Sequence, residues 1–253
     1  MKITFLGTGT SSGVPLIGCQ CDVCTSADPK DHRLRTSVFI QHHQKNICID
    51  IGPDFRQQML RHAINNIDAF LITHGHRDHI AGLDDIRPLN FIHQNKIPVF
   101  CNEVTKQMIY EQFGYAFKNT TYEYAPKVDF RVINDALFHF EDIAIMPICV
   151  KHANLDVLGF RIADFVYITD ANFIAEKELD KLKNAKILVL NALRTQPHNS
   201  HFTIAEALAI IEKVKPEKAY LIHMSHQFGL HEVVEKTLPS NVFLTYDNLE
   251  ISI

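Results

Sequence analysis

Short apolar runs bounded by polar residues or glycine recur along this chain, which is the pattern of buried β-strands. The runs predict strands at Ile3–Leu6, Val38–Gln41, Ile47–Ile51, Ala69–Thr73, Ile143–Val150, Phe165–Thr169 and Ala219–Ile222. Helical spacing of apolar residues predicts helices at Ile80–Ile86, Glu103–Phe113 and Ile204–Val214. This alternation indicates a mixed α/β protein.

The composition suits one globular unit. Of the 253 residues, 46% are hydrophobic and 21% are charged, which is ordinary for a chain with a large buried core. No linker, charge run, repeat or low-complexity stretch divides the sequence. We therefore expect residues 1–253 to form a single domain.

The N-terminal segment and the cysteines indicate a cytoplasmic protein. Glycine interrupts the first apolar residues too early for a signal peptide. No apolar stretch approaches the ~20 residues that cross a bilayer. The spacing of the six cysteines resembles that of metal-binding or core thiols more than a disulfide framework. Cys48, Cys101 and Cys149 lie inside apolar runs, so we expect them in the core.

The richest chemistry lies in the run Thr73-His74-Gly75-His76-Arg77-Asp78-His79, directly after a predicted strand. His74 and His76 fall on one side of an extended backbone, and Asp78 and His79 follow where the chain turns. Imidazole and carboxylate groups are metal ligands, and two such pairs suit two adjacent ions. Fifteen histidines make chance clusters conceivable, but these fixed offsets favour a metal site.

Three further residues of ligand type occupy matching positions elsewhere. His152, Asp170 and His223 each follow an apolar strand-like run. The carboxyl ends of strands are the usual location of sites in α/β folds. Each residue alone could be a solvated strand end, but the repetition at four strands favours a shared site.

This pattern resembles the metallo-β-lactamase superfamily of binuclear metallohydrolases. The resemblance runs from Phe5-Leu-Gly-Thr-Gly to the C-terminal Tyr246-Asp-Asn-Leu-Glu-Ile. It implies an αββα sandwich of two mixed β-sheets flanked by helices. The resemblance also implies how the ligands are shared. The first metal would bind His74, His76 and His152, and the second would bind Asp78, His79 and His223. Asp170 would bridge the two metals. Asp50 matches a motif whose carboxylate supports the site without binding metal.

A second cluster is the loop Gly18-Cys19-Gln20-Cys21-Asp22-Val23-Cys24. Three thiolates this close can hold one tetrahedral Zn²⁺ and leave a position for a distant ligand. His226 is a suitable fourth ligand because it lies three residues after His223. Unremarkable free thiols are the alternative, and an iron–sulfur cluster would normally require a fourth cysteine.

The cysteine loop together with Leu221-Ile-His223-Met-Ser-His226-Gln-Phe is similar to the PhnP-type branch of the superfamily, whose namesake is a cyclic phosphodiesterase. The branch implies a structural zinc on Cys19, Cys21, Cys24 and His226. It also implies a catalytic histidine at His201. The branch of pyrroloquinoline quinone accessory proteins shares a similar cysteine loop.

These residues predict a phosphodiesterase that acts on small, cyclic phosphodiesters. Two divalent ions would activate water and neutralise phosphoryl charge, with Asp78 and its fellow ligands holding them. His201 would protonate the departing alkoxide as a general acid. The ligand types accept Zn²⁺, Mn²⁺ or Fe²⁺, so the identity of the two catalytic ions stays open.

Charge and loop composition exclude several partners. The net charge of −4 lacks the basic footprint of a polynucleotide binder, and we expect neither a membrane nor an extended nucleic-acid partner. A small phosphate ester needs few cations, and the candidates are Arg35, Arg87, Lys151 and Arg194. The glycine-rich segment 7–13 has the wrong spacing for a dinucleotide, and we expect it near the metal site. A homodimer is among the expectations.

Other functions share parts of this pattern. A thioester hydrolase of the glyoxalase II type uses the same ligands, but the cysteine loop and His201 favour phosphodiester cleavage. A tRNase Z-like nuclease would need an RNA-holding arm, and no long basic insertion is present. A β-lactamase is disfavoured by Asp170, where many of those enzymes have cysteine. A non-enzymatic metal or redox sensor would predict an incomplete ligand set.

Overall fold

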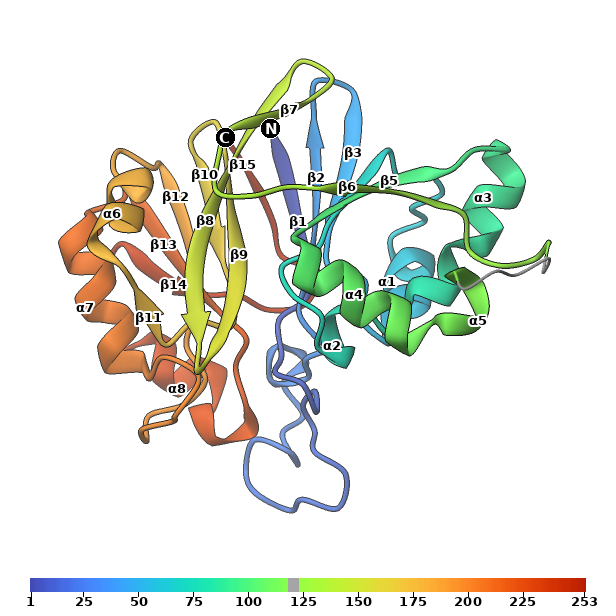
Figure 1. Cartoon of the computed structure of the whole chain (residues 1–253). Helices are drawn as coiled ribbons and strands as arrows, with labels where there is room; N and C mark the ends of the chain where they lie inside the picture. The colour runs from blue at the N-terminus through green and yellow to red at the C-terminus, as the bar shows by residue number, and fades with distance from the viewer. Residues whose placement is uncertain (118–122) are drawn as a thin grey trace.

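Two mixed β-sheets pack face to face in the computed structural model, which describes residues 1–117 and 123–253 (Figure 1). The first sheet has the strand order β15 (Glu250–Ser252), β1 (Lys2–Gly7), β2 (Ser37–His42), β3 (Lys45–Ile49), β4 (Ala69–Leu71), β5 (Ile97–Cys101) and β6 (Val128–Val132). The second has the order β11 (Phe173–Ile174), β8 (Ile143–His152), β9 (Leu155–Ile162), β10 (Phe165–Ile168), β12 (Ile187–Asn191), β13 (Lys218–Ile222) and β14 (Val242–Leu244), and β7 (Phe138–Phe140) pairs with β8.

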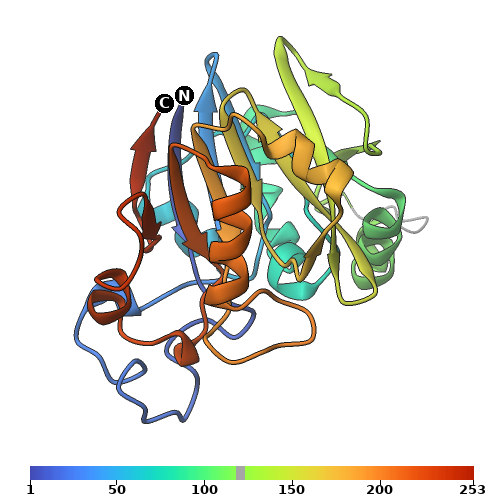
Figure 2. The ribbon, with the colours of Figure 1, turned by 90° about the vertical axis from the view of Figure 1, so that its left-hand side faces the viewer.

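Helices cover the outer face of each sheet (Figures 1 and 2). Beside the first sheet lie α1 (Phe55–Arg61), α2 (Arg77–Ile80), α3 (Arg87–His93), α4 (Glu103–Gln112), α5 (Gly114–Phe117) and the 3-10 turn η2 (Leu83–Ile86). Beside the second lie α6 (Glu176–Leu179), α7 (Ile204–Val214), α8 (His231–Glu235) and the 3-10 turns η3 (Asp180–Leu182) and η4 (His226–Phe228). The turn η1 (Pro29–Asp31) follows the cysteine loop. This is the predicted αββα sandwich, so the fold prediction is confirmed.

The alternation of side chains along each central strand explains the layers. In β10, Phe165 and Tyr167 point into the core between the sheets, whereas Val166 and Ile168 join the core beneath α6 and α7. Side chains of successive strand residues point to opposite faces, so a strand covered on both faces must be apolar throughout. The continuous apolar runs of the sequence therefore belong to strands with two buried faces.

The observed elements correct the sequence predictions in three places. The helix predicted over Ile80–Ile86 is wrong as one element, because α2 ends at Ile80 and η2 begins at Leu83. At the break, a Cβ on Gly82 would lie 2.2 Å from the Gly52 carbonyl oxygen, so the chain must pass close to that loop. His152 is the last residue of β8 rather than the residue after it, and β4 ends at Leu71, before Thr73.

Parallel pairing sets the location of the site. Strands β3 to β6 run parallel in one sheet, and β10, β12, β13 and β14 run parallel in the other. Their carboxyl ends therefore gather at the edge where the loops with the candidate ligands begin. Cys48 and Cys101 are buried as predicted, and Cys149 is half-buried. No helix among residues 1–117 and 123–253 is long and apolar enough to span a membrane.

Candidate metal centre

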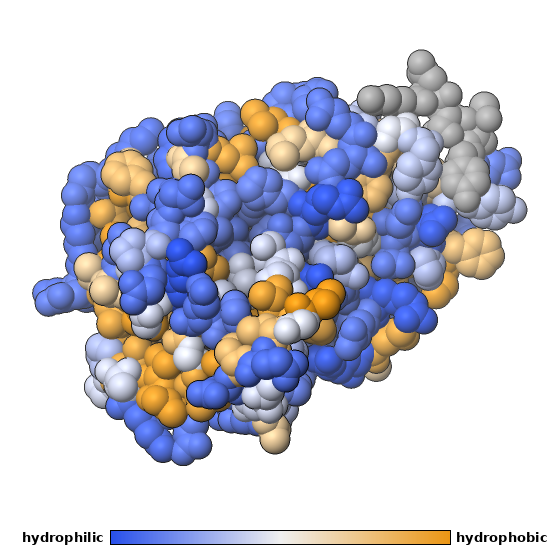
Figure 3. Space-filling view, turned by 90° about the horizontal axis from the view of Figure 1, so that it is seen from below, coloured by the Kyte–Doolittle hydropathy of each residue, from blue (hydrophilic) through white to orange (hydrophobic). Residues whose placement is uncertain are grey.

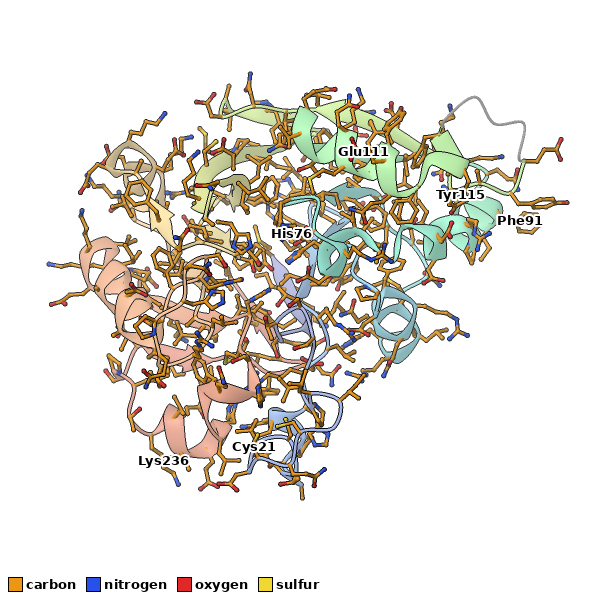
Figure 4. The ribbon with its side chains drawn as sticks, turned by 60° about the horizontal axis from the view of Figure 1, so that its bottom comes forward. Cys21, His76, Phe91, Glu111, Tyr115 and Lys236 are labelled. Carbon is orange, nitrogen blue, oxygen red and sulfur yellow. The ribbon has the colours of Figure 1, made fainter. Side chains whose placement is uncertain are left out.

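The predicted ligands of the catalytic centre come together at the strand ends. One group is His74, His76 and His152, and the other is Asp78, His79, Asp170 and His223. Within each group the ligand atoms all lie within 4.8 Å of one another. Figure 4 shows His76 near the middle of this end of the molecule, and Figure 3 shows that hydrophilic residues and hydrophobic patches are interspersed on this face. Residues from both sheets thus form one compact cluster.

Asp50 organises the first sheet's contribution. Its carboxylate accepts hydrogen bonds from the Thr73 amide at 2.8 Å and from His79 Nδ1 at 2.6 Å. The Thr73 hydroxyl also donates to Asp50 and lies 3.0 Å from His74 Nδ1. A carboxylate behind a histidine fixes the ring and leaves the second nitrogen for a metal. Asp50 therefore has the supporting position that the resemblance implied.

The inner ring nitrogens test whether a metal fits. The Nε2 atoms of His74, His79 and His223 are buried and have no hydrogen-bond partner. On the outer side of its ring, His152 donates from Nδ1 to the Ser200 carbonyl at 2.7 Å. Buried polar atoms without partners are costly, and a bound cation would satisfy all of them. The donor set therefore fits divalent metal ions.

Asp170 lies between the two groups of ligands. Its Oδ2 is 3.3 Å from His79 Nε2, and its Oδ1 is 3.2 Å from His223 Nε2. Burial opposes its ionisation, but the imidazoles of His223 and His79 hold the pKa of Asp170 well below its usual range. Asp170 also belongs to a third group with His152 and His201, so a bridging position is geometrically available to it.

The backbone is strained at three of these residues. Asp50, Asp170 and His223 have φ angles of 64°, 51° and 62°, in the left-handed region that residues other than glycine seldom adopt. Such conformations persist where the surrounding structure enforces them, and they concentrate at functional sites. Each residue follows the last residue of its strand directly or within two positions, so the strain turns the chain toward the cluster.

His201 lies against the same cluster. Its Nε2 is 3.0 Å from Asp170 Oδ1, and its ring stacks on His223 with centroids 4.9 Å apart. On the outer side, its Nδ1 is 3.0 Å from the Ser200 hydroxyl. Burial lowers the pKa of His201 to about 4, against the opposing hydrogen bond with Asp170. His201 is thus within reach of the centre, and its inner nitrogen faces it.

The cysteine loop lies against η4, the turn that begins at His226. Cys19, Cys21, Cys24 and His226 place their ligand atoms within 4.8 Å of one another (Cys21 in Figure 4). His226 Nδ1 lies 3.3 Å from Cys19 Sγ and 3.4 Å from Cys21 Sγ. A tetrahedral zinc with bonds of ordinary length would place these atoms about 3.5 Å apart. The spacing therefore fits one Zn²⁺ at this second location.

The four candidate cations all have partners within the protein. Arg35 pairs with Asp54 at 3.1 Å, and Lys151 pairs with Asp156 at 2.6 Å. Arg87 donates to the Asp84 carbonyl at 2.9 Å. Arg194 donates to main-chain carbonyls of its own loop. None of these contacts assigns a phosphate-binding role.

The glycine-rich loop lies beside the centre, where Thr10 N donates to the carbonyl of Met224, the neighbour of His223.

Two contributors to the site were not predicted from the sequence. Thr73 links Asp50 to His74 through its hydroxyl, and Ser200 fixes His152 through its carbonyl. The position of Thr73, between a strand and the first ligand, was a usable indication. A main-chain carbonyl leaves no trace in the sequence, so the role of Ser200 required the structure.

Comparisons with known proteins identify the family. Residues 45–224 match the model of the β-lactamase superfamily domain. A crystal structure described as a new diphosphatase from the PhnP family is 38% identical, with a TM-score of 0.93, and the match covers 100% of this chain and 97% of that chain. The zinc-bound PqqB of Methylobacterium extorquens is 14% identical, with a TM-score of 0.78 over 100% of both chains, and shows the fold alone.

One curated relative is considerably longer. A protein named octanoyltransferase from Porphyromonas gingivalis is 37% identical over 253 residues, which cover 99% of this chain and 51% of that protein. This chain therefore spans about half of the length of that relative. The family match and the whole-chain structural likeness agree with the motifs and the fold. The chain belongs to the metallo-β-lactamase superfamily, in its PhnP-like branch.

Proposed function

We propose that this protein is a binuclear metal-dependent phosphodiesterase that acts on small phosphodiesters, cyclic ones included. The observation that carries the proposal is the position of His201, whose Nε2 lies 3.0 Å from Asp170 Oδ1 at the edge of both ligand groups. A thioester has a good leaving group and needs little proton donation. A histidine at this position is most useful where an alkoxide departs.

The proposed roles of the residues follow from their contacts. One ion would be held by His74, His76 and His152. The other ion would be held by Asp78, His79 and His223, and Asp170 would contact both ions. When bound, two such ions supply Lewis-acid activation of water and neutralise charge at phosphorus. Asp50 orients His79, and the Ser200 carbonyl orients His152. Burial lowers the pKa of His201, but the negative charge of a bound phosphodiester favours its imidazolium form, which delivers the proton to the leaving oxygen from Nε2. Cys19, Cys21, Cys24 and His226 would hold a structural zinc.

The relatives favour particular substrates for the test. The structure with 38% identity carries the name diphosphatase, so diphosphate esters belong beside cyclic and linear phosphodiesters. The longer relative carries an acyltransferase name, which makes an acyl thioester the second candidate substrate. We further propose a cytoplasmic location, in keeping with the six free thiols.

A substrate panel tests this proposal. Purified protein loaded with Zn²⁺ or Mn²⁺ should hydrolyse bis-p-nitrophenyl phosphate and a 2′,3′-cyclic nucleotide with higher kcat/KM than an acyl thioester or a β-lactam. Hydrolysis of the thioester alone would replace the proposal with the second candidate. A diphosphate ester as the best substrate would retain the phosphoryl chemistry and change the substrate class.

A further inference from the structure

Arg194 contacts both the loop before His201 and the turn η4 that carries His226. It follows β12 and begins the loop that ends at His201. Its Nε donates to the Gln196 carbonyl at 3.2 Å, and its Nη2 donates to the Pro197 carbonyl at 2.9 Å. Its Nη1 donates to Gln227 Oε1 at 2.7 Å. One guanidinium thus fixes the outer part of the His201 loop and joins it to the residue after His226.

Other hydrogen bonds define the rest of this loop. At its base, Leu193 N donates to the Phe202 carbonyl at 2.9 Å, and Ile204 N donates to the Arg194 carbonyl at 3.1 Å. On its inner side, the Ser200 carbonyl accepts from His152 at 2.7 Å. In the outer segment 195–198, Arg194 contacts two carbonyls, and His198 Nδ1 lies 3.2 Å from the Ser200 hydroxyl and 3.2 Å from His201 Nδ1.

The partner of Arg194 is itself anchored at the cysteine site. Gln227 lies in η4, and its main-chain N–H donates to the Ser225 hydroxyl at 3.2 Å. The same hydroxyl donates to the Leu193 carbonyl at 2.9 Å, at the start of the His201 loop. His226 lies between Ser225 and Gln227 in the sequence, and its Nδ1 is close to the thiols of Cys19 and Cys21. Gln227 therefore joins Arg194 to the turn that carries His226.

We infer that Arg194 is a positioning residue for His201, which it serves by clamping the His201 loop to η4 through Gln227. The inference rests on the proposed function, because it assigns the clamp to the proton donor of that reaction. All three bonds of Arg194 would be lost or weakened in any substitution, since a planar fork of donors is unique to arginine. Misplacement of the proton donor would slow the reaction, because an error of about 1 Å can reduce a rate by ~10²-fold.

Four variants of the metal-loaded protein test the clamp. Arg194→Gln removes the fork, and Gln227→Leu removes only its acceptor. Gln227→Glu keeps an acceptor oxygen at the same place and should restore the clamp. The matched control is Arg161→Gln, because Arg161 also donates to three carbonyls, those of Ala163, Lys181 and Lys183, but lies at the opposite end of β9 from His152.

Two readouts are needed, and the first does not depend on activity. Hydrogen exchange of a peptide covering residues 194–203 should be about 10-fold faster in Arg194→Gln and Gln227→Leu, and unchanged in Gln227→Glu and in the control. The second is kcat on two phosphodiesters. We expect a loss of about 10-fold on a 2′,3′-cyclic nucleotide and little loss on bis-p-nitrophenyl phosphate, whose leaving group needs no proton.

The outcomes separate the clamp from the proposed function. Unchanged exchange in both Arg194→Gln and Gln227→Leu would overturn the clamp. A rise in KM on both substrates in Arg194→Gln, with Gln227→Leu unaffected, would also overturn it and assign Arg194 to direct substrate binding. If the unmodified protein cleaves no phosphodiester, the proposed function fails, and the exchange measurement alone still decides whether Arg194 orders the loop.

Discussion

Asp50 Oδ2 accepts a hydrogen bond of 2.6 Å from His79 Nδ1, and both side chains are fully buried. Burial raises the pKa of Asp50, and contact with His79 opposes that rise. Burial of His79 opposes its protonation, yet the carboxylates of Asp78, Asp170 and Asp50 raise its pKa well above the ordinary value. This concentration of negative charge around one imidazole is an environment that a divalent cation would stabilise.

The first prediction concerns this pair. Asp50→Asn removes the charge that orients His79, so metal affinity should fall by about 10–100-fold. Metal titration followed by elemental analysis measures the affinity. The control is Asp142→Asn, because Asp142 makes a similarly short contact of 2.7 Å with the exposed His43 and should be dispensable. Equal metal affinity in Asp50→Asn and the control would show that Asp50 does not support the centre.

The second prediction concerns the cysteine loop. Cys19→Ser should lose one zinc per chain and lower the free energy of unfolding, because structural zinc binding is coupled to folding. Elemental analysis and chemical denaturation measure the two effects. Cys149→Ser replaces a half-buried thiol outside the cluster and should keep its zinc. Full zinc content and unaltered stability in Cys19→Ser would refute the structural site.

The third prediction concerns the bridge. Asp170→Ala removes the carboxylate that faces His79, His223 and His201, so hydrolysis should be abolished and catalytic metal lost. The zinc held by the cysteine loop should remain, since Asp170 does not belong to the group formed by Cys19, Cys21, Cys24 and His226. Asp180→Ala, which alters an exposed carboxylate paired with Lys183, is the control. Retention of both catalytic ions with near-normal turnover would mean that Asp170 is not the bridge.

The fourth prediction concerns the start of α7. The Thr203 side chain accepts from the Glu206 amide at 3.2 Å, and Glu206 reciprocates in a capping box. Thr203→Ala should therefore cost about 1 kcal/mol of stability. Chemical denaturation measures the loss, and Thr203→Ser, which keeps the hydroxyl, should recover most of it. An equal loss in both variants would assign the effect to the methyl group and not to the cap.

The sequence predicted best those elements whose structure depends on residues close together in the chain. The helix Ile204–Val214 was predicted with its observed bounds, because its apolar face is local information. The grouping of the candidate ligands was predictable because they lie at or after the ends of apolar strands, whose carboxyl ends gather at one edge of the fold. The helix expected over Ile80–Ile86 failed because Gly82 must pass beside Gly52, a contact that no local pattern encodes.

Contacts between distant segments account for the rest. Arg194 was a candidate phosphate ligand from its sequence position, but the structure commits its donors to two carbonyls and to Gln227. Arg35 and Lys151 likewise have carboxylate partners. The availability of a charged side chain depends on which residues lie within a few ångströms, and the sequence alone does not give that.

The most direct test of a binuclear phosphodiesterase with His201 as its proton donor compares two substrates in His201→Ala. A ribose alkoxide needs a proton to depart, whereas p-nitrophenolate leaves largely unaided. We predict that kcat on a 2′,3′-cyclic nucleotide falls by about 10²–10⁴-fold while kcat on bis-p-nitrophenyl phosphate changes little, with the metal content unaltered. Equal losses on the two substrates, or loss of metal from the variant, would contradict the assignment of His201 as the general acid.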